Sequence, residues 1–111
     1  MILVACAVGK ELAFFESLPH VEMLVTGVGP VEAAASISRA LAQSPYELVI
    51  NAGIAGALEG CAEIGEGVVV ADEFFHIGLE NGAPLSLPDG THVIDCAGSD
   101  LSLVDRLVEM G

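Results

Sequence analysis

Three short stretches of the sequence carry the residue types that could do chemistry. Glu11 follows the apolar run "ILVACAV" by a few residues, and a carboxylate in that position could accept a proton from water. The stretches "TGVGP" and "NAGIAG", at residues 26–30 and 51–56, have few large side chains. Glycines there would let a ligand reach the backbone, whose N–H groups suit oxygen atoms. We call these two stretches the bare turns, because they have few large side chains. Together with the acid, they indicate a site for a small polar ligand.

Each of these features also has a plain structural interpretation. An acid in the first turn of a helix is favoured by the helix dipole without any catalytic role. Glycines between a strand and a helix can simply allow tight packing. Neither turn has the Gly-Lys-Ser/Thr of a phosphate loop, and "GVGPVE" lacks the third glycine of the dinucleotide fingerprint. Because two bare turns follow adjacent predicted strands, we favour the functional interpretation.

Alternating strands and helices would position these stretches. The continuous apolar run at 2–8 is typical of a strand buried on both faces, as in a parallel sheet. Further strands are predicted at 21–26, 47–52 and 65–74. Helices are predicted at 10–18, from Pro30 to 44, and at 99–110 with Ser99 as a possible cap.

This alternation predicts an α/β fold of three layers, with a mostly parallel or mixed central sheet flanked by helices. We expect one domain over residues 1–111. Small residues at Ala33, Ala34 and Ser38 would let the second helix lie close to the sheet. Ligands of open α/β sheets bind beyond the carboxyl ends of the strands, which is where both bare turns fall.

Composition excludes several partners. The net charge of −13, with only three Lys and Arg residues, opposes binding to nucleic acid or to an anionic membrane. The N-terminal run has no basic segment before it and no cleavage site, unlike a signal peptide. Cys6, Cys61 and Cys96 are odd in number and match no metal-ligand spacing, which predicts reduced thiols in the cytoplasm and no bound metal.

Four segments in their order carry a family resemblance: "VACAVGKEL", "VTGVGPVEAA", "VINAGIAGAL" and "IGEGVVVADEFFHIGLENG". Together they resemble the nucleoside phosphorylase and nucleosidase superfamily, and within it most of all the futalosine hydrolases. The resemblance implies hydrolysis of the N-glycosidic bond of a purine nucleoside, with futalosine and water giving dehypoxanthine futalosine and hypoxanthine in menaquinone biosynthesis. It also implies a homo-oligomer and no cofactor.

The same resemblance implies roles for particular residues. Glu11 falls where the nucleosidases keep the acid that positions and deprotonates the attacking water. Val8 and Val28 fall on positions that line the ribose and 5′-substituent pocket, beside Gly29 of the bare turn. The turn beneath the sugar and base corresponds to Gly53, Ile54, Ala55 and Gly56. Phe74 and Phe75 would be pocket walls or packing residues, and His76 a ligand contact or an ordinary polar residue.

Departures from the family pattern refine this hypothesis. Ile54 stands where many nucleosidases have Ser, which favours futalosine over methylthioadenosine or S-adenosylhomocysteine, the alternative substrates. The first turn lacks the Gly-Asp-Pro and the Arg with which phosphorylases bind phosphate, so water is the expected nucleophile. A non-catalytic nucleotide-binding or assembly domain is the alternative of another class. A flavodoxin-like module is disfavoured by the 5% aromatic content.

Part of the family's machinery is not found in the sequence. Relatives hold the ribose hydroxyls with a Met-Glu pair and protonate the purine with the Asp of a Ser-Asp pair. Here Glu109-Met110 has the reverse order, and Asp100 reads as a helix cap. We therefore expect the N-terminal half of a longer family domain, inactive as 111 residues alone. Such a half-sheet would expose an apolar edge, which predicts that the isolated chain associates with itself or with a missing portion.

Overall fold

A computed structural model describes residues 1–74, 79–80, 83–84, 86–91 and 96–111. The chain divides into two compact units, Met1–Cys61 and Ala62–Gly111, and each is described by itself. The single domain expected over 1–111 stays a prediction.

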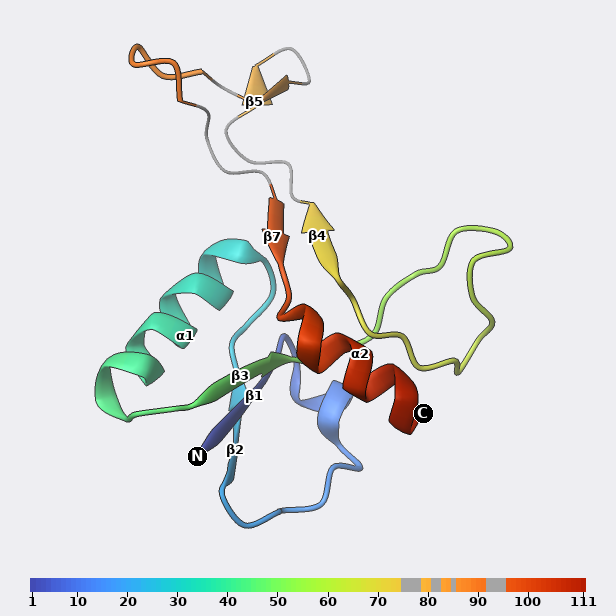
Figure 1. The fold of residues 1–111 in the computed structure, drawn as a ribbon. Coiled ribbons are helices and arrows are strands. Elements are labelled where there is room, and N and C mark those ends of the chain that lie inside the picture. Colours follow the sequence, from blue (N-terminus) through green and yellow to red (C-terminus); the bar gives the residue numbers. More distant parts are fainter. Residues whose placement is uncertain (75–78, 81–82, 85, 92–95) are drawn as a thin grey trace. The chain divides into compact units, whose positions relative to one another are not determined.

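A parallel sheet of three strands forms the first unit (Figure 1). Strand β1 (Ile2–Cys6) lies at its centre, between β2 (Val21–Val25) and β3 (Leu48–Asn51). Ile2 is in register with Val21 on one side and with Leu48 on the other. Residues 3–6 of β1 are all buried. The continuous apolar run therefore forms the two-sided buried strand that the sequence predicts.

Helix α1 (Pro30–Gln43) joins β2 to β3, which lie on opposite sides of β1, as expected for parallel strands of one sheet that need a crossover connection. Its partly buried residues recur at intervals of three and four, namely Ala33, Ser36, Ile37 and Ala40, which is one face of a helix. The prediction that Ala34 and Ser38 lie on this inner face is wrong, because both are exposed.

The prediction of a helix over residues 10–18 is also wrong. Only a single 3-10 turn, η1 (Gly9–Leu12), forms there. Of the apolar residues at helical spacing, Leu12 and Phe15 are only partly buried and Leu18 is 51% exposed, so this spacing does not build a buried helical face. Pro19 disfavours helical backbone at the residue before it, and the chain instead runs through turns to β2.

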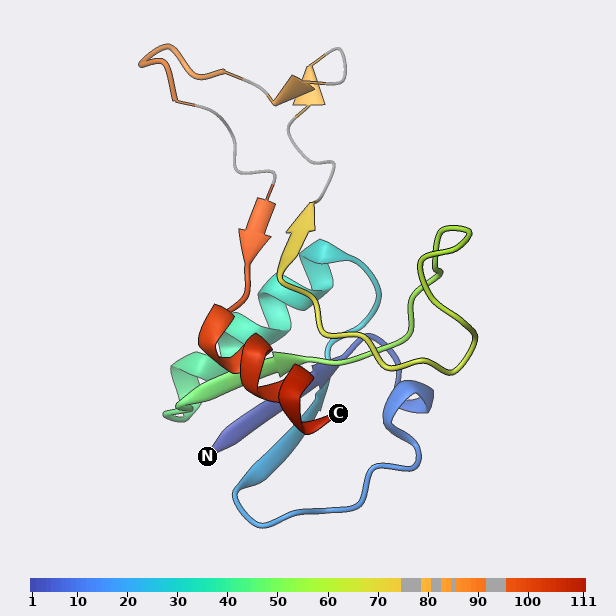
Figure 2. The same cartoon turned by 45° about the vertical axis from the view of Figure 1, so that its right-hand side comes forward.

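The second unit contains short strands and one helix. Strand β4 (Asp72–Phe74) pairs antiparallel with β7 (Cys96–Gly98), and the two lie side by side in Figures 1 and 2. Strands β5 (Leu79–Glu80) and β6 (Ala83–Pro84) form another antiparallel pair. The chain ends in helix α2 (Leu101–Met110). In the described part of the chain, no helix is both long and apolar enough to span a bilayer.

Two predictions for this unit need correction. The strand expected over 65–74 is reduced to residues 72–74. Gly65, the first residue of the expected strand, has a φ of +85°, so it cannot be part of an extended run. The cap of α2 is Asp100 and not Ser99. Its Oδ1 accepts hydrogen bonds from the backbone N–H groups of Ser102, at 3.0 Å, and Leu103, at 3.3 Å. The expectation that Asp100 is a helix cap is thus confirmed.

Candidate active site

The turns that follow β1, β2 and β3, called the first, second and third turns below, meet at one edge of the first unit's sheet. Parallel strands place their carboxyl ends together, and hydrogen bonds continue beyond the strand ends. The Gly27 N–H donates to the Ala7 carbonyl at 3.1 Å. On the other side, the Ala52 N–H donates to the Ala5 carbonyl at 2.8 Å. The two bare turns therefore flank the turn that carries Glu11.

The Glu11 carboxylate is held by backbone N–H groups from two of these turns. Its Oε2 accepts hydrogen bonds from Ala7, at 3.0 Å, and from Val8, at 3.1 Å. Its Oε1 accepts a hydrogen bond from the Ile54 N–H at 3.2 Å. The side chain thus bridges the turn after β1 and the turn after β3.

These contacts determine the charge state of the acid. The hydrogen bond from the Val8 N–H, followed by the one from Ile54, lowers the pKa of Glu11 below its ordinary value of 4.5, against a smaller opposing effect of desolvation. Glu11 is therefore ionised at neutral pH. A carboxylate offers about four acceptor positions, and three are used by the backbone. About one position remains for an external donor.

Thr26 positions the second turn, and the sequence reasoning missed it. Its side chain is 7% exposed, and its hydroxyl lies 3.2 Å from the Cys6 carbonyl oxygen and 2.8 Å from that of Gly27. The Ser36 hydroxyl of α1 donates to the Thr26 carbonyl at 3.0 Å. The only sequence signal was a threonine at the start of "TGVGP", where a buried hydroxyl needs local acceptors.

The predicted site residues cluster at this edge to different degrees. Val8, Gly53 and Ile54 directly surround the Glu11 carboxylate. Val28 and Gly29 follow Gly27, whose backbone bonds to the same turn.

Two of the most exposed side chains at the edge are apolar. The side chain of Ile54 is 85% exposed and that of Val28 is 73% exposed, so neither is used in protein packing. Ala55 and Gly56 continue the third turn, and a methyl group added at Gly56 would have no neighbour within 4 Å. Phe74 lies in β4 of the other unit, while Phe75 and His76 lie outside the described residues.

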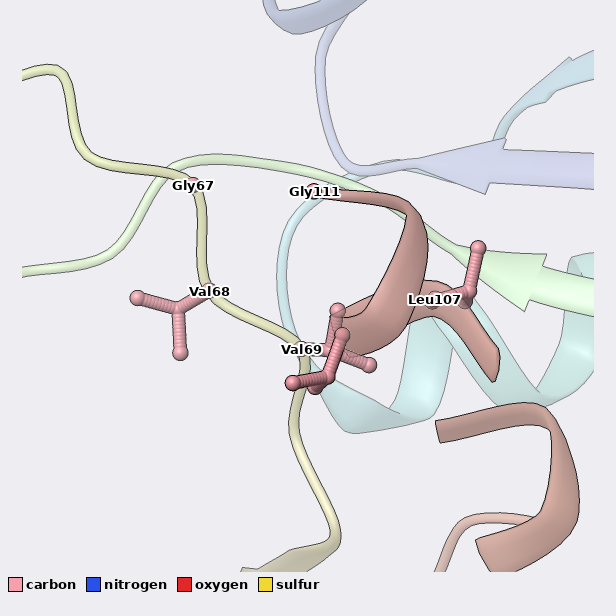
Figure 3. Close-up of a pocket in the computed structure, with 6 residues that line it drawn as sticks. Gly67, Val68, Val69, Leu107 and Gly111 are labelled. Atoms are coloured by element: carbon pink, nitrogen blue, oxygen red, sulfur yellow. The ribbon is translucent and has the colours of Figure 1, made fainter. Parts of the chain in front are cut away.

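A hollow of about 400 Å³ lies in the second unit and carries no such chemistry (Figure 3). Its lining is apolar or backbone only, formed by Gly67, Val68, Val69, Leu107, Val108 and Gly111. Among the residues that the structure describes, no group of three or more His, Cys, Asp or Glu side chains is placed to hold a metal ion. The candidate chemistry therefore rests on the edge around Glu11.

Comparison with known proteins agrees with this arrangement. The profile of the phosphorylase superfamily matches residues 6–110. The futalosine hydrolase of Thermus thermophilus is 40% identical over 67 residues, which is 59% of this chain and 30% of that protein. The match thus spans about a third of the relative's length. No solved structure matches the chain. Because the family profile covers nearly the whole chain, and the parallel sheet with its crossover helix suits an α/β fold, the chain belongs to the phosphorylase superfamily.

Proposed function

We propose that the chain belongs to a nucleosidase that hydrolyses the N-glycosidic bond of a purine nucleoside. The observation that carries this proposal is the Glu11 carboxylate, fixed by three backbone N–H groups at the edge where an α/β sheet binds its ligand. The relative in Thermus thermophilus is named a futalosine hydrolase. We therefore take futalosine as the substrate, with dehypoxanthine futalosine and hypoxanthine as the products.

The proposed reaction requires Glu11 to act only as a weak base. As the bond between the sugar C1′ and the purine nitrogen breaks, its electron pair leaves with the purine, which takes up a proton to become the neutral base, and the sugar becomes oxocarbenium-like. A water oxygen then bonds to C1′. Water attached to a cationic carbon is acidic, so an ionised carboxylate with a lowered pKa can still take its proton. Before that step, the free acceptor position of Glu11 would orient the water, and its charge would favour the cationic sugar.

Water is favoured over phosphate as the nucleophile. Backbone N–H groups in a glycine-rich turn are the groups that bind a phosphate. In the first turn, the N–H groups of Ala7 and Val8 already bind Glu11. An ionised carboxylate at the same place would also repel an anion. Hydrolysis therefore fits this edge better than phosphorolysis does.

The substrate assignment rests on the relative and on the third turn. What Ile54 gives to Glu11 is its backbone N–H, which a serine at that position would also supply. Its exposed side chain is free to contact a ligand, and an apolar contact there suits futalosine in our hypothesis. Methylthioadenosine or S-adenosylhomocysteine is the alternative. A cytoplasmic, homo-oligomeric enzyme remains part of the proposal.

The test is purine release by the product of the whole open reading frame that contains residues 1–111, with the 111 residues alone measured beside it. We expect hypoxanthine from futalosine, and we expect Glu11→Gln to lower kcat/KM by about 10²–10⁴-fold, the usual range of general-base catalysis. Release of adenine from methylthioadenosine instead would overturn the substrate. A Glu11→Gln variant with unchanged kcat/KM would overturn the catalytic role and favour a non-catalytic binding domain.

The nucleophile is tested separately. Adding inorganic phosphate to the assay should leave both the rate and the free-sugar product unchanged. Formation of a sugar 1-phosphate, with a rate that rises with phosphate, would show that the enzyme is a phosphorylase.

A further inference from the structure

Gly53 lies where no side chain fits. A Cβ atom built on Gly53 would be 2.8 Å from Glu11 Oε1 and 3.3 Å from its Cδ. Separations under 3.0 Å do not occur for real Cβ atoms. By contrast, the backbone of Gly53 does not require glycine, because its φ lies outside the left-handed region. Glycine is therefore required at position 53 by the nearby Glu11 carboxylate and not by the backbone conformation.

The space at Gly53 is also what brings the acid to the third turn. Glu11 Oε1 passes Gly53 to reach the N–H of Ile54, the next residue, at 3.2 Å. The other oxygen, Oε2, is satisfied within the first turn by Ala7 and Val8. The contact beside Gly53 thus fixes which way the remaining acceptor position of the carboxylate faces.

We propose that Gly53 is a positioning residue for Glu11: the absence of its side chain makes the gap through which the carboxylate binds the Ile54 N–H. Its effect on hydrolysis rests on the function proposed above, while its effect on the acid does not. This role differs from contact with a nucleoside, which the family resemblance implies for the same turn.

Substitution with alanine gives a selective perturbation. The atoms that the new methyl group would meet belong to the end of the Glu11 side chain, which can rotate away while the backbone stays in place. We therefore expect Gly53→Ala to fold, to lose the hydrogen bond from Ile54, and to keep those from Ala7 and Val8. Gly56→Ala adds the same group three residues later in open space and is the matched control for these spectroscopic measurements.

The first readout is NMR of the 111-residue chain and needs no substrate. Gly53→Ala should raise the pKa of Glu11, followed at its side-chain carboxyl carbon, because one of the hydrogen bonds that lower it is lost. The Ile54 amide proton should shift at the same time. Gly56→Ala should leave both at their wild-type values. If Gly53→Ala also leaves the Glu11 pKa and the Ile54 amide unchanged, the proposal is overturned.

The second readout is kinetic and uses the full reading-frame product. A displaced carboxylate should lower kcat/KM by about 10–100-fold, since a misplacement of about 1 Å costs about 10²-fold. The acidic limb of the pH profile should move to higher pH. In a Glu11→Ala background, the added Gly53→Ala should have less than about a twofold further effect. An equal loss in both backgrounds would mean that Gly53 contacts the substrate directly, which contradicts positioning through Glu11.

Folding supplies the remaining control. If Gly53→Ala lowers the urea midpoint of the wild-type chain, it should not lower the midpoint of the Glu11→Ala variant further, because the clashing atoms are already gone there. An equal loss in both backgrounds would show that the clash is not with Glu11 and would overturn the proposal. A wild-type enzyme that hydrolyses no nucleoside would contradict the proposed function. The NMR comparison would still decide whether Gly53 positions the Glu11 carboxylate.

Discussion

Replacing Gly29 by alanine should destabilise the first unit although the new methyl group would touch nothing. Gly29 is the N-cap of α1 and has φ of 98° and ψ of 162°, a region that is essentially restricted to glycine. No atom lies within 4 Å of its built Cβ. Backbone strain of this kind costs about 1–3 kcal/mol. A stiffer unfolded chain offsets about 0.4–1 kcal/mol, so we expect a net loss of about 1–2 kcal/mol.

Gly56→Ala is the control, since it also adds a methyl group in open space but has no positive φ. It should change the free energy of unfolding by between zero and a gain of about 1 kcal/mol. The chain has one tyrosine and no tryptophan, and Tyr46 lies in the first unit. Its fluorescence during urea unfolding therefore reports on that unit. Equal stability of the Gly29→Ala and Gly56→Ala variants would refute the argument from backbone conformation.

Two further predictions use the same fluorescence measurement. Folding lowers the pKa of Glu11, so its ionised form stabilises the fold above the unfolded pKa of about 4.5, and this contribution is lost as the pH falls through the lower folded pKa. The stability difference between wild type and Glu11→Gln should therefore shrink between about pH 6 and pH 3. A difference that stays constant over this range would contradict the prediction. Thr26→Val should lower the free energy of unfolding by about 1–2 kcal/mol, because it removes a buried hydroxyl whose single proton lies within hydrogen-bond distance of two carbonyl oxygens. Thr26→Ser should lose less. A Thr26→Val variant as stable as wild type would show that this hydroxyl contributes nothing net.

Elements with a strong local signal could be predicted from the sequence. The apolar run of β1, the Pro30 start of α1, and the strand that precedes "NAGIAG" all form close to their expected bounds. In each of these segments, the local conformational preference of the residues agrees with the tertiary environment, so the segment can be predicted from the sequence. The placement of Glu11 beside the bare turns follows from the parallel order of these strands.

Other features depend on contacts that no local pattern contains. The segment 10–18 has helical apolar spacing, yet only one 3-10 turn forms, and the chain then runs through turns to Pro19. Val68 and Val69 read as part of a strand, yet they line the hollow beside Leu107. The bond from Ile54 to Glu11 joins residues 43 positions apart, so only the assembled sheet reveals it.

This long sequence separation has a consequence for how the acid acquires its properties. The N–H groups of Ala7 and Val8 are neighbours of Glu11 in the chain and can find it early, whereas Ile54 arrives only after β3 has docked on β1. Closing so long a loop is slow compared with local turn formation. During synthesis, Glu11 thus lacks the hydrogen bond from Ile54 until the third strand is in place, and that bond becomes an indicator of completed assembly.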